Sequence, residues 1–268
     1  MPYEAELAGA LAAARAAGTL VLEAYSTFTA IPDARADITT DADRAAQEAI
    51  LRELRRRFPA DALCAEEQTP TLAGAPHEGP RLWVVDPIDG TRGFAQKNGE
   101  FSVMVGFVDR GRVAVGVVYE PANDRLTRAV LGGGCWREDG GAAAERCRVS
   151  ATADLAAATL TQSRSKPGKV SRQVELLQPA KVIETHSAGI KLALVARGRA
   201  DLYVNHYEAF HDWDICAGHI LVAEAGGKVT GLRGEEIVYG TPGAWQRSRL
   251  LASNGALHAA ALERCEGV

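Results

Sequence analysis

The stretch Trp83-Val84-Val85-Asp86-Pro87-Ile88-Asp89-Gly90-Thr91 joins an apolar segment to two carboxylates and a tight turn. Its apolar residues predict a short strand that ends at Asp86, and the proline restricts the backbone between the two acids. Gly90 lets a ligand approach the backbone closely, and the N–H groups of Gly90 and Thr91 can bind a phosphate oxygen if a helix begins there. The pattern indicates a divalent metal beside a phosphate. Taken alone, it is explained as well by a plain turn, because Asp, Pro and Gly are common turn residues.

The composition is that of an ordinary globular protein. The chain has 268 residues, 47% hydrophobic and 24% charged, which is enough for one large or two modest domains with buried cores. A formal net charge of −4 argues against a protein that coats nucleic acid. The five cysteines form no C-x-x-C pair, and the N-terminus lacks the basic region of a secretory signal. Since we also find no apolar run of membrane-span length, we predict a cytoplasmic protein with neither a membrane nor a nucleic-acid polymer as partner.

The first half of the chain predicts two helices followed by an antiparallel sheet. Residues 4–26 repeat small and apolar residues at helical spacing, and a second helix is expected to open within residues 37–43. The Gly- and Pro-rich segment 69–80 is expected to be a non-helical loop. Apolar runs separated by turn residues then predict a meander that closes near residues 132–134. These runs are residues 101–108, 113–119 and 126–130.

The pattern changes near residue 150. Short strands and helices alternate from there on, and residues 213–225 form a helix stopped by two glycines. We therefore predict a layered α+β architecture with an N-terminal domain of residues 1–150, a C-terminal domain of residues 151–268 and a cleft between them.

Four acidic residues lie at the ends of separate predicted elements. They are Glu66, Asp86, Asp89 and Asp214. Such an all-oxygen set suits Mg²⁺, which completes its coordination with water and substrate phosphate, and the lack of His and Cys argues against zinc. A structural alternative stays open for Asp214, because acids are stabilised in the first turn of a helix. The same holds for Asp43, which with Thr40 resembles a capping box.

These motifs resemble those of the inositol monophosphatase superfamily. The matching segments are Asp86-Pro87-Ile88-Asp89-Gly90-Thr91, Trp213-Asp214-Ile215-Cys216-Ala217-Gly218, Glu66-Glu67 and residues 37–43, the last similar to a D-x-x-T-x-x-D pattern. They occur in the family's order and cover nearly the whole chain. The resemblance implies an αβαβα layered fold and a Mg²⁺-dependent, lithium-sensitive phosphomonoesterase.

The resemblance also implies a role for each residue. The metal ligands would be Glu66, Asp86 and the carbonyl of Ile88 for one ion, and Asp86, Asp89 and Asp214 for a second. A third, weaker ion is implied near Glu66, and Mn²⁺ is expected to substitute for Mg²⁺. Glu66 and Thr91 would orient the attacking water, Asp43 is included among the catalytic residues, and the N–H groups of Gly90 and Thr91 would bind phosphate. Direct in-line displacement by water follows, without a phosphoenzyme. The D-x-x-D spacing separates this motif from the D-x-D of haloacid dehalogenase phosphatases.

Further segments favour a nucleotide bisphosphate as substrate. Four segments resemble those of the 3'(2'),5'-bisphosphate nucleotidases. They are Thr91-Arg92-Gly93-Phe94, residues 97–101, Ser163-Arg164-Ser165 and residues 187–191. Arg92 is a candidate substrate contact on this ground. Arg164 and Lys191 are candidates for the 5'-phosphate that is retained, since a second dianion needs its own cationic group. Ordinary surface exposure also explains any single one of the cations Arg92, Lys97, Lys166, Lys169 and Arg172. The implied reaction converts 3'-phosphoadenosine 5'-phosphate to AMP and phosphate.

Residues 205–212 depart from the pattern. They lack the Arg…Pro-Thr run of bacterial bisphosphate nucleotidases, and Glu208 lies one place from the acid with which inositol phosphatases bind substrate hydroxyls. Glu208 is therefore a candidate substrate contact, and His206 or His211 is a candidate for the leaving-group pocket. An inositol-1-phosphate or other sugar-phosphate phosphatase is the nearest alternative, and a non-catalytic protein that binds a phosphate ligand is a remote one. Because the superfamily is often dimeric, a homodimer is a possible assembly.

Overall fold

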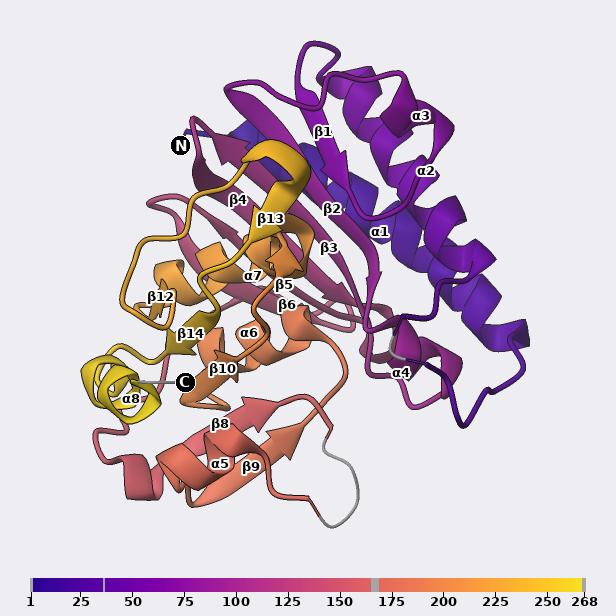
Figure 1. The fold of residues 1–268 in the computed structure, drawn as a ribbon. Coiled ribbons are helices and arrows are strands. Elements are labelled where there is room, and N and C mark those ends of the chain that lie inside the picture. Colours follow the sequence, from indigo (N-terminus) through magenta and orange to yellow (C-terminus); the bar gives the residue numbers. More distant parts are fainter. Residues whose placement is uncertain (1, 36, 165–168, 267–268) are drawn as a thin grey trace.

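The computed structural model describes residues 2–35, 37–164 and 169–266, which form alternating layers of helices and sheets (Figure 1). Two long helices cover one face of a large sheet, and two further helices lie between that sheet and a smaller one. Two short helices cover the outer face of the smaller sheet. The predicted αβαβα layering is confirmed.

The large sheet is a seven-stranded meander. Its strands follow the order of the chain, with β1 parallel to β2 and all later neighbours antiparallel. They are β1 (Ala62–Ala65), β2 (Arg81–Asp89), β3 (Ser102–Asp109), β4 (Arg112–Glu120), β5 (Arg125–Val130), β6 (Gly134–Asp139) and β7 (Glu145–Arg146). The short 3-10 helix η1 (Pro121–Asn123) links β4 to β5.

Two sequence predictions about this sheet were wrong. β2 does not end at Asp86 but continues to Asp89 through a register shift against β3, and such a bulge tolerates a proline within a strand. The sheet also does not close near residues 132–134. Gly132 and Gly134 have positive φ angles of 74° and 79°, so the chain turns there and returns as β6.

The outer layer consists of α1 (Glu4–Thr27) and α2 (Asp41–Arg57), close to their predicted positions. By length and composition α1 also passes as a membrane-spanning helix, which corrects the expectation that no apolar run is long enough. In the structure its alanine face packs against α2, β3 and β4, as in a core helix. Segment 69–80 contains the short helix α3 (Pro70–Ala73), contrary to the predicted loop, because proline suits the first position of a helix.

The smaller sheet has the order β12-β14-β10-β8-β9. Its strands are β8 (Thr159–Gln162), β9 (Lys181–Glu184), β10 (Leu202–Asn205), β12 (Lys228–Thr230) and β14 (Leu250–Ser253). A separate two-stranded sheet pairs β11 (Phe210–His211) with β13 (Trp245–Gln246). The outer helices are α5 (Arg172–Leu177) and α8 (His258–Cys265), and the 3-10 helices η2 (Leu155–Ala157) and η3 (Pro242–Ala244) lie in connections. The first sheet thus ends before residue 150 and the second begins after it, while the division into two domains stays a prediction.

Helices α6 (Ala188–Ala196) and α7 (Asp212–Glu224) form the central layer. Two glycines that face each other on β3 and β4 let α7 approach the large sheet closely. A Cβ on Gly106 would lie 2.6 Å from Cys216 Sγ, and one on Gly116 would lie 2.3 Å from the carbonyl oxygen of Ala217. Since the first turn of α7 carries Asp214, this contact brings that carboxylate towards the large sheet.

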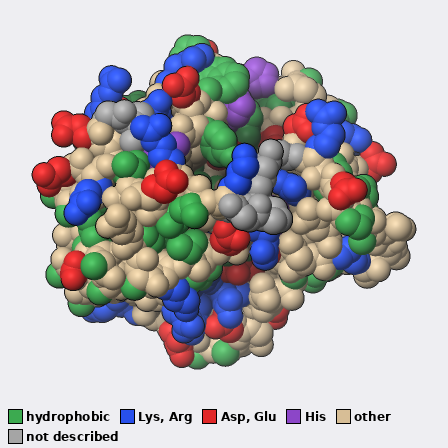
Figure 2. All heavy atoms as spheres, turned by 60° about the horizontal axis from the view of Figure 1, so that its bottom comes forward, with side chains coloured by type: hydrophobic (Ala, Val, Ile, Leu, Met, Phe, Trp, Pro, Cys, Tyr) green, Lys and Arg blue, Asp and Glu red, His purple; other side chains and the backbone are tan. Residues whose placement is uncertain are grey.

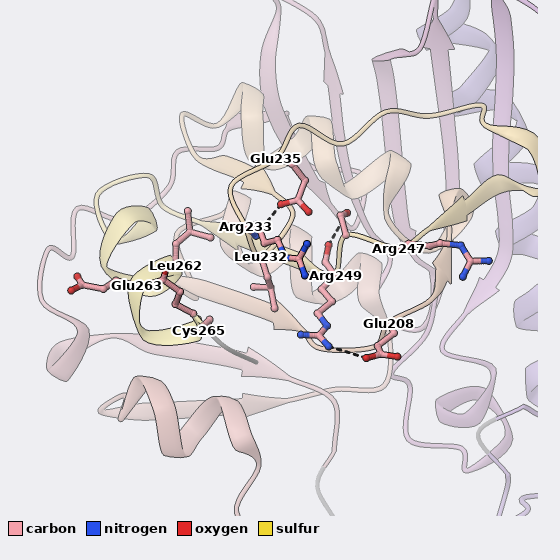
Figure 3. A pocket seen from close by; sticks show the side chains of 11 residues that line it. Glu208, Leu232, Arg233, Glu235, Arg247, Arg249, Leu262, Glu263 and Cys265 are labelled. Carbon is pink, nitrogen blue, oxygen red and sulfur yellow. Dashed lines mark hydrogen bonds and ion pairs between the residues drawn. The ribbon is translucent and has the colours of Figure 1, made fainter.

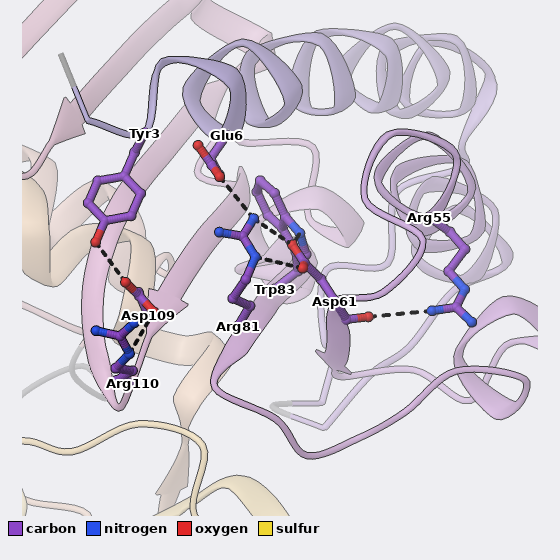
Figure 4. A network of polar contacts seen from close by, with 8 residues as sticks. All are labelled: Tyr3, Glu6, Arg55, Asp61, Arg81, Trp83, Asp109 and Arg110. Atoms are coloured by element: carbon purple, nitrogen blue, oxygen red, sulfur yellow. Dashed lines mark hydrogen bonds and ion pairs between the residues drawn. The ribbon is translucent and has the colours of Figure 1, made fainter.

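A polar network ties the N-terminal helix to the start of β2 (Figure 4). Arg81 donates to Glu6 Oε1 at 2.9 Å and to Asp61 Oδ1 at 2.7 Å. Trp83 Nε1 donates to Asp61 Oδ2 at 3.1 Å, so Asp61, which is 4% exposed, is paired on both oxygens. The network fixes the end of β2 that lies away from the two carboxylates.

Candidate active site

The bulge in β2 holds the first carboxylate. Asp86 is 3% exposed, and Ile88 N donates to its Oδ1 at 3.1 Å. Desolvation, together with the negative charges of Glu66, Asp89 and Asp214, raises the pKa of Asp86 well above its usual value. A buried acid surrounded by other acids needs either a proton or a cation.

Glu66 follows β1, and Asp214 lies in the first turn of α7. Desolvation and the charges of Asp214 and Asp43 raise the pKa of Glu66 to about 8. Desolvation is also the main reason that the pKa of Asp214 rises to about 7. Asp214 Oδ2 accepts a hydrogen bond from His211 N at 2.6 Å, so the residue caps its helix and also adds charge to the cluster.

Asp43 joins the start of α2 to the turn after β2. Its Oδ2 accepts bonds from Thr40 N at 2.8 Å and Thr40 Oγ1 at 2.6 Å, as the predicted capping box requires. Its Oδ1 lies 2.9 Å from Thr91 Oγ1, which is also 2.9 Å from the carbonyl oxygen of Ile88. A hydroxyl has one proton, which Thr91 shares between these acceptors. The two contacts orient the Thr91 hydroxyl.

Asp89 is held differently from the other carboxylates. Its Oδ1 accepts a bond from Ala188 N at 3.0 Å, and its Oδ2 accepts one from Gly189 N at 2.7 Å. Ser102 Oγ at 3.2 Å and Ser187 Oγ also donate to Oδ2. The N-terminus of α6 therefore stabilises the charge of Asp89. Its role as a metal ligand stays a prediction, because these bonds engage both oxygens.

Residues 187–189 were expected at the substrate, and their contact with Asp89 was not foreseen. The only sequence signal was the quoted resemblance of this segment. Gly189 is required by packing: a Cβ there would lie 2.3 Å from Met104 Sδ and 2.7 Å from Ser102 Oγ. Gly90, with φ of 87°, precedes the short helix α4 (Thr91–Ala95), so a helix begins where the phosphate site was predicted.

The donor chemistry fits a divalent cation. Among the residues the structure describes, no group of three or more His, Cys, Asp or Glu side chains is arranged to hold a metal ion directly. Desolvation, and in addition their mutual repulsion, nevertheless raise the pKa values of three of the carboxylates, and these side chains offer only oxygen. A hard cation such as Mg²⁺ would offset this repulsion. The residues that would hold it are Glu66, Asp86, Asp214, the carbonyl of Ile88 and Asp89.

Lys191, a predicted contact of the substrate phosphate, is only 2% exposed. Its Nζ donates to the carbonyl oxygen of His186 at 3.3 Å and lies 5.2 Å from the ring centroid of Tyr203. Desolvation lowers the pKa of Lys191 to about 8, against the attraction of Asp89 and Asp214. The structure places Lys191 as an internal counter-charge to these acids, and its contact with substrate stays a prediction.

The other charged side chains predicted to contact substrate do not lie in one pocket. Arg164 donates through Nε to Glu100 Oε2 at 2.9 Å and borders a pocket of about 270 Å³. Glu208 instead lines a separate pocket of about 930 Å³, where Arg249 Nη2 donates to its Oε1 at 3.0 Å (Figure 3). Arg92 Nε is buried without a hydrogen-bond partner in the described part of the chain. Ser165 lies outside the described residues.

The two candidate histidines differ. His206 lines the same pocket as Arg164, and both of its ring nitrogens are buried with no partner among the described residues. The pKa of His206 is lowered by desolvation and then by Arg249 and Arg172. The ring of His211 is stacked on Trp213, with centroids 4.1 Å apart, and also packs against Trp245. His206 is therefore the better candidate for contact with a leaving group.

Known proteins match this chain over its whole length. The model of the inositol monophosphatase family matches residues 3–267. The chain is 35% identical over 224 residues to a fructose-1,6-bisphosphatase/inositol-1-monophosphatase of Thermotoga maritima, covering 83% of this chain and 80% of that protein. It is 32% identical over 231 residues to the 3'(2'),5'-bisphosphate nucleotidase CysQ of Escherichia coli, covering 84% and 90%. The structure of an inositol monophosphatase from Anabaena superposes with a TM-score of 0.81 at 29% identity, over 100% of this chain and 98% of that one.

Members of this family are metal-dependent phosphatases that act on small phosphate esters, which confirms the predicted reaction class. The fold, the order of the motifs and the convergence of the carboxylates agree with these matches. The chain belongs to the inositol monophosphatase family.

Proposed function

We propose that this phosphatase hydrolyses the 3'-phosphate of a 3'(2'),5'-bisphosphate nucleotide, such as 3'-phosphoadenosine 5'-phosphate, with two or three Mg²⁺ ions. The observation that carries the choice of substrate is the pocket bordered by Arg164. It combines this cation with the aromatic residues Tyr203 and Tyr207 and with His206. Aromatic side chains can stack on a nucleobase, and a guanidinium can bind a second phosphate.

The pocket adjoins the carboxylates through Tyr203. The ring of Tyr203 packs against the ammonium group of Lys191, which in turn lies near Asp89 and Asp214. The Glu100 partner of Arg164 also accepts a bond from His186 N at 3.2 Å, at the entry to α6. A bisphosphate that reaches from the carboxylates into the pocket would compete with Glu100 for Arg164.

Different residues would have different roles in the reaction. Bound cations supply water activation and charge stabilisation at the phosphoryl group. Thr91 Oγ1, which contacts Asp43 Oδ1 and the carbonyl oxygen of Ile88, would orient the attacking water together with Glu66. The N–H groups of Gly90 and Thr91 would receive phosphate oxygens.

A sugar-phosphate substrate is the second candidate, because of the burial of Lys191. Because Lys191 is buried, Arg164 is the only one of the two predicted cations that is exposed to bind a retained 5'-phosphate. The similarity to the fructose-1,6-bisphosphatase/inositol-1-monophosphatase supports the same alternative. Basic and acidic side chains are interspersed over the face seen in Figure 2, which suits a small substrate better than a nucleic-acid polymer.

Phosphate release from matched panels of the two ester classes tests the proposal. We expect kcat/KM for 3'-phosphoadenosine 5'-phosphate to exceed that for inositol-1-phosphate, and Arg164→Met to lower only the former. Arg172→Met, which changes a nearby arginine outside the pocket lining, is the control. Faster turnover of inositol-1-phosphate, with no effect of Arg164→Met, would overturn the nucleotidase assignment but leave the phosphatase intact. The proposal also includes activity with Mn²⁺ in place of Mg²⁺ and inhibition by lithium, which the same assay checks. It further includes a homodimer, checked by light scattering, and a cytoplasmic location, checked by cell fractionation.

A further inference from the structure

We propose that Cys135 and Cys147 form a redox-sensitive thiol pair, which a small hydroperoxide converts into a disulfide. The pair lies at the β6–β7 edge of the large sheet, whereas Asp86 and Asp89 lie on β2 near the opposite edge. The phosphatase reaction has no use for either thiol. Their chemistry is therefore a separate property of the fold.

The strand register sets the two residues opposite each other. Trp136 pairs with Arg146 in the β6–β7 ladder, and Cys147 N donates to the carbonyl oxygen of Cys135 at 2.8 Å as the ladder continues. Residues opposed in an antiparallel ladder have Cα atoms about 4.5–5.5 Å apart and side chains on one face of the sheet. A disulfide joins Cα atoms roughly 4.4–6.8 Å apart, so the backbone need not move far. The two thiols are close enough for each to shift the pKa of the other.

A buried arginine lies near both thiols and favours a thiolate at either of them. Arg197, next to the end of α6, has a side chain 3% exposed, and its Nη1 donates to Glu120 Oε1 at 2.6 Å. Its Nε and Nη2 are buried without a hydrogen-bond partner among the described residues. The hydrogen bond from Cys135, and then the charge of Arg197, lower the pKa of the Cys147 thiol, while that of Cys135 is raised. Cys147 is 7% exposed and Cys135 is fully buried, so an oxidant reaches Cys147 first; we assign Cys147 as the nucleophile and Cys135 as the resolving thiol.

The other three cysteines are natural internal controls. Burial raises the pKa of Cys64 to about 12 and also raises the pKa values of Cys216 and Cys265. A thiol with a raised pKa is a poor nucleophile near neutral pH. We therefore expect oxidation to select one pair out of five thiols.

The reaction is a balanced two-electron oxidation. The Cys147 thiolate attacks one oxygen of hydrogen peroxide, the O–O bond breaks, and the products are a sulfenic acid and, after proton uptake, water. The Cys135 sulfur then attacks the sulfenic sulfur, and the hydroxyl leaves as a second water with the Cys135 proton. Two thiols and one peroxide thus become one disulfide and two waters. Cys147 is 7% exposed and Cys135 fully buried, so the oxidant has to be small.

Oxidation of the reduced, full-length protein tests the proposal without mutation. The protein is treated with a small excess of hydrogen peroxide, its remaining thiols are alkylated under denaturing conditions, and its peptides are analysed by mass spectrometry. We expect two of the five thiols to be lost, a Cys135–Cys147 cross-linked peptide, and full recovery with dithiothreitol. We also expect this pair to oxidise about tenfold faster or more than Cys64. A different pair, an intermolecular cross-link, or equal oxidation of all thiols would overturn the proposal.

Two matched variants test the roles of the thiols. In Cys135→Ser the sulfenic acid on Cys147 has no resolving thiol, so dimedone should label Cys147 during oxidation. In Cys147→Ser dimedone should not label Cys135. Cys265→Ser, which removes a buried cysteine elsewhere, should oxidise like the wild type. Equal dimedone labelling in the first two variants would contradict the assignment of Cys147 as the nucleophile.

Discussion

Replacing Asp214 by asparagine removes one charge from the carboxylate cluster and keeps the cap of α7. His211 N donates to Asp214 Oδ2 at 2.6 Å, and an amide oxygen can accept the same bond. In the metal-free protein the pKa of this carboxyl is raised from 3.8 to about 7, chiefly by desolvation. One pKa unit corresponds to about 1.4 kcal/mol, which makes the full destabilisation roughly 4 kcal/mol. The side chain is 33% exposed, so solvent screening reduces the expected effect to about 2 kcal/mol.

The effect of this charge depends on pH. The unfolded carboxyl ionises near pH 3.8 and the native one near pH 7, so the native state binds more protons between these values. The charge of Asp214 does not destabilise the native state below pH 3.8. Its destabilising effect grows as the pH rises and is complete above about pH 7. Without metal, we expect Asp214→Asn to unfold roughly 4 °C above the wild type at about pH 8, with a gain that shrinks in acid.

Thermal unfolding followed by circular dichroism, first with EDTA and then with excess MgCl₂, measures the stability of the two proteins without and with the cation. Mg²⁺ should stabilise the wild type and have little effect on Asp214→Asn, which should also lose most of its phosphatase turnover. Asp154→Asn is the control, because Asp154 is an exposed acid that caps η2 through Ala156 N at 3.0 Å. If Asp214→Asn were less stable than the wild type at about pH 8, or responded equally to Mg²⁺, the assignment of Asp214 to a cation site would be wrong.

Three further substitutions test contacts of α6, of α8 and of the start of β2. Gly189→Ala places a Cβ 2.3 Å from Met104 Sδ, so urea unfolding should show a loss of about 1–3 kcal/mol, with turnover reduced because α6 moves from its position. Buried His258 has its pKa lowered from 6.5 to about 4, so the wild type should lose about 3 kcal/mol of unfolding free energy as the pH falls between these values, and His258→Gln should not. Asp61→Ala leaves the indole N–H of Trp83 unpaired and should cost about 2–3 kcal/mol in urea without changing KM.

The elements that sequence periodicity predicted well are those with long, regular patterns. Helix α1, strands β3 to β5 and helix α7 lie within a few residues of their expected positions. The errors fall where single residues decide the backbone. Pro87 did not end β2, because a bulge accommodated it, and the glycines at 132 and 134 turned the chain instead of ending the sheet.

The sequence by itself determined the family and the layered fold, because the motifs keep their order along the chain. It also singled out four acids at the ends of separate elements, whose role as metal ligands stays a prediction. Only the tertiary structure decided what each side chain contacts. Asp89 is bonded to residues about a hundred positions away, and Lys191 is buried, with its contact to substrate still a prediction. Cys135 and Cys147 meet because a Gly-rich turn extends the sheet by two strands. The physical reason is that spacing along the chain identifies residues on one element, whereas contacts between elements arise only when the layers pack.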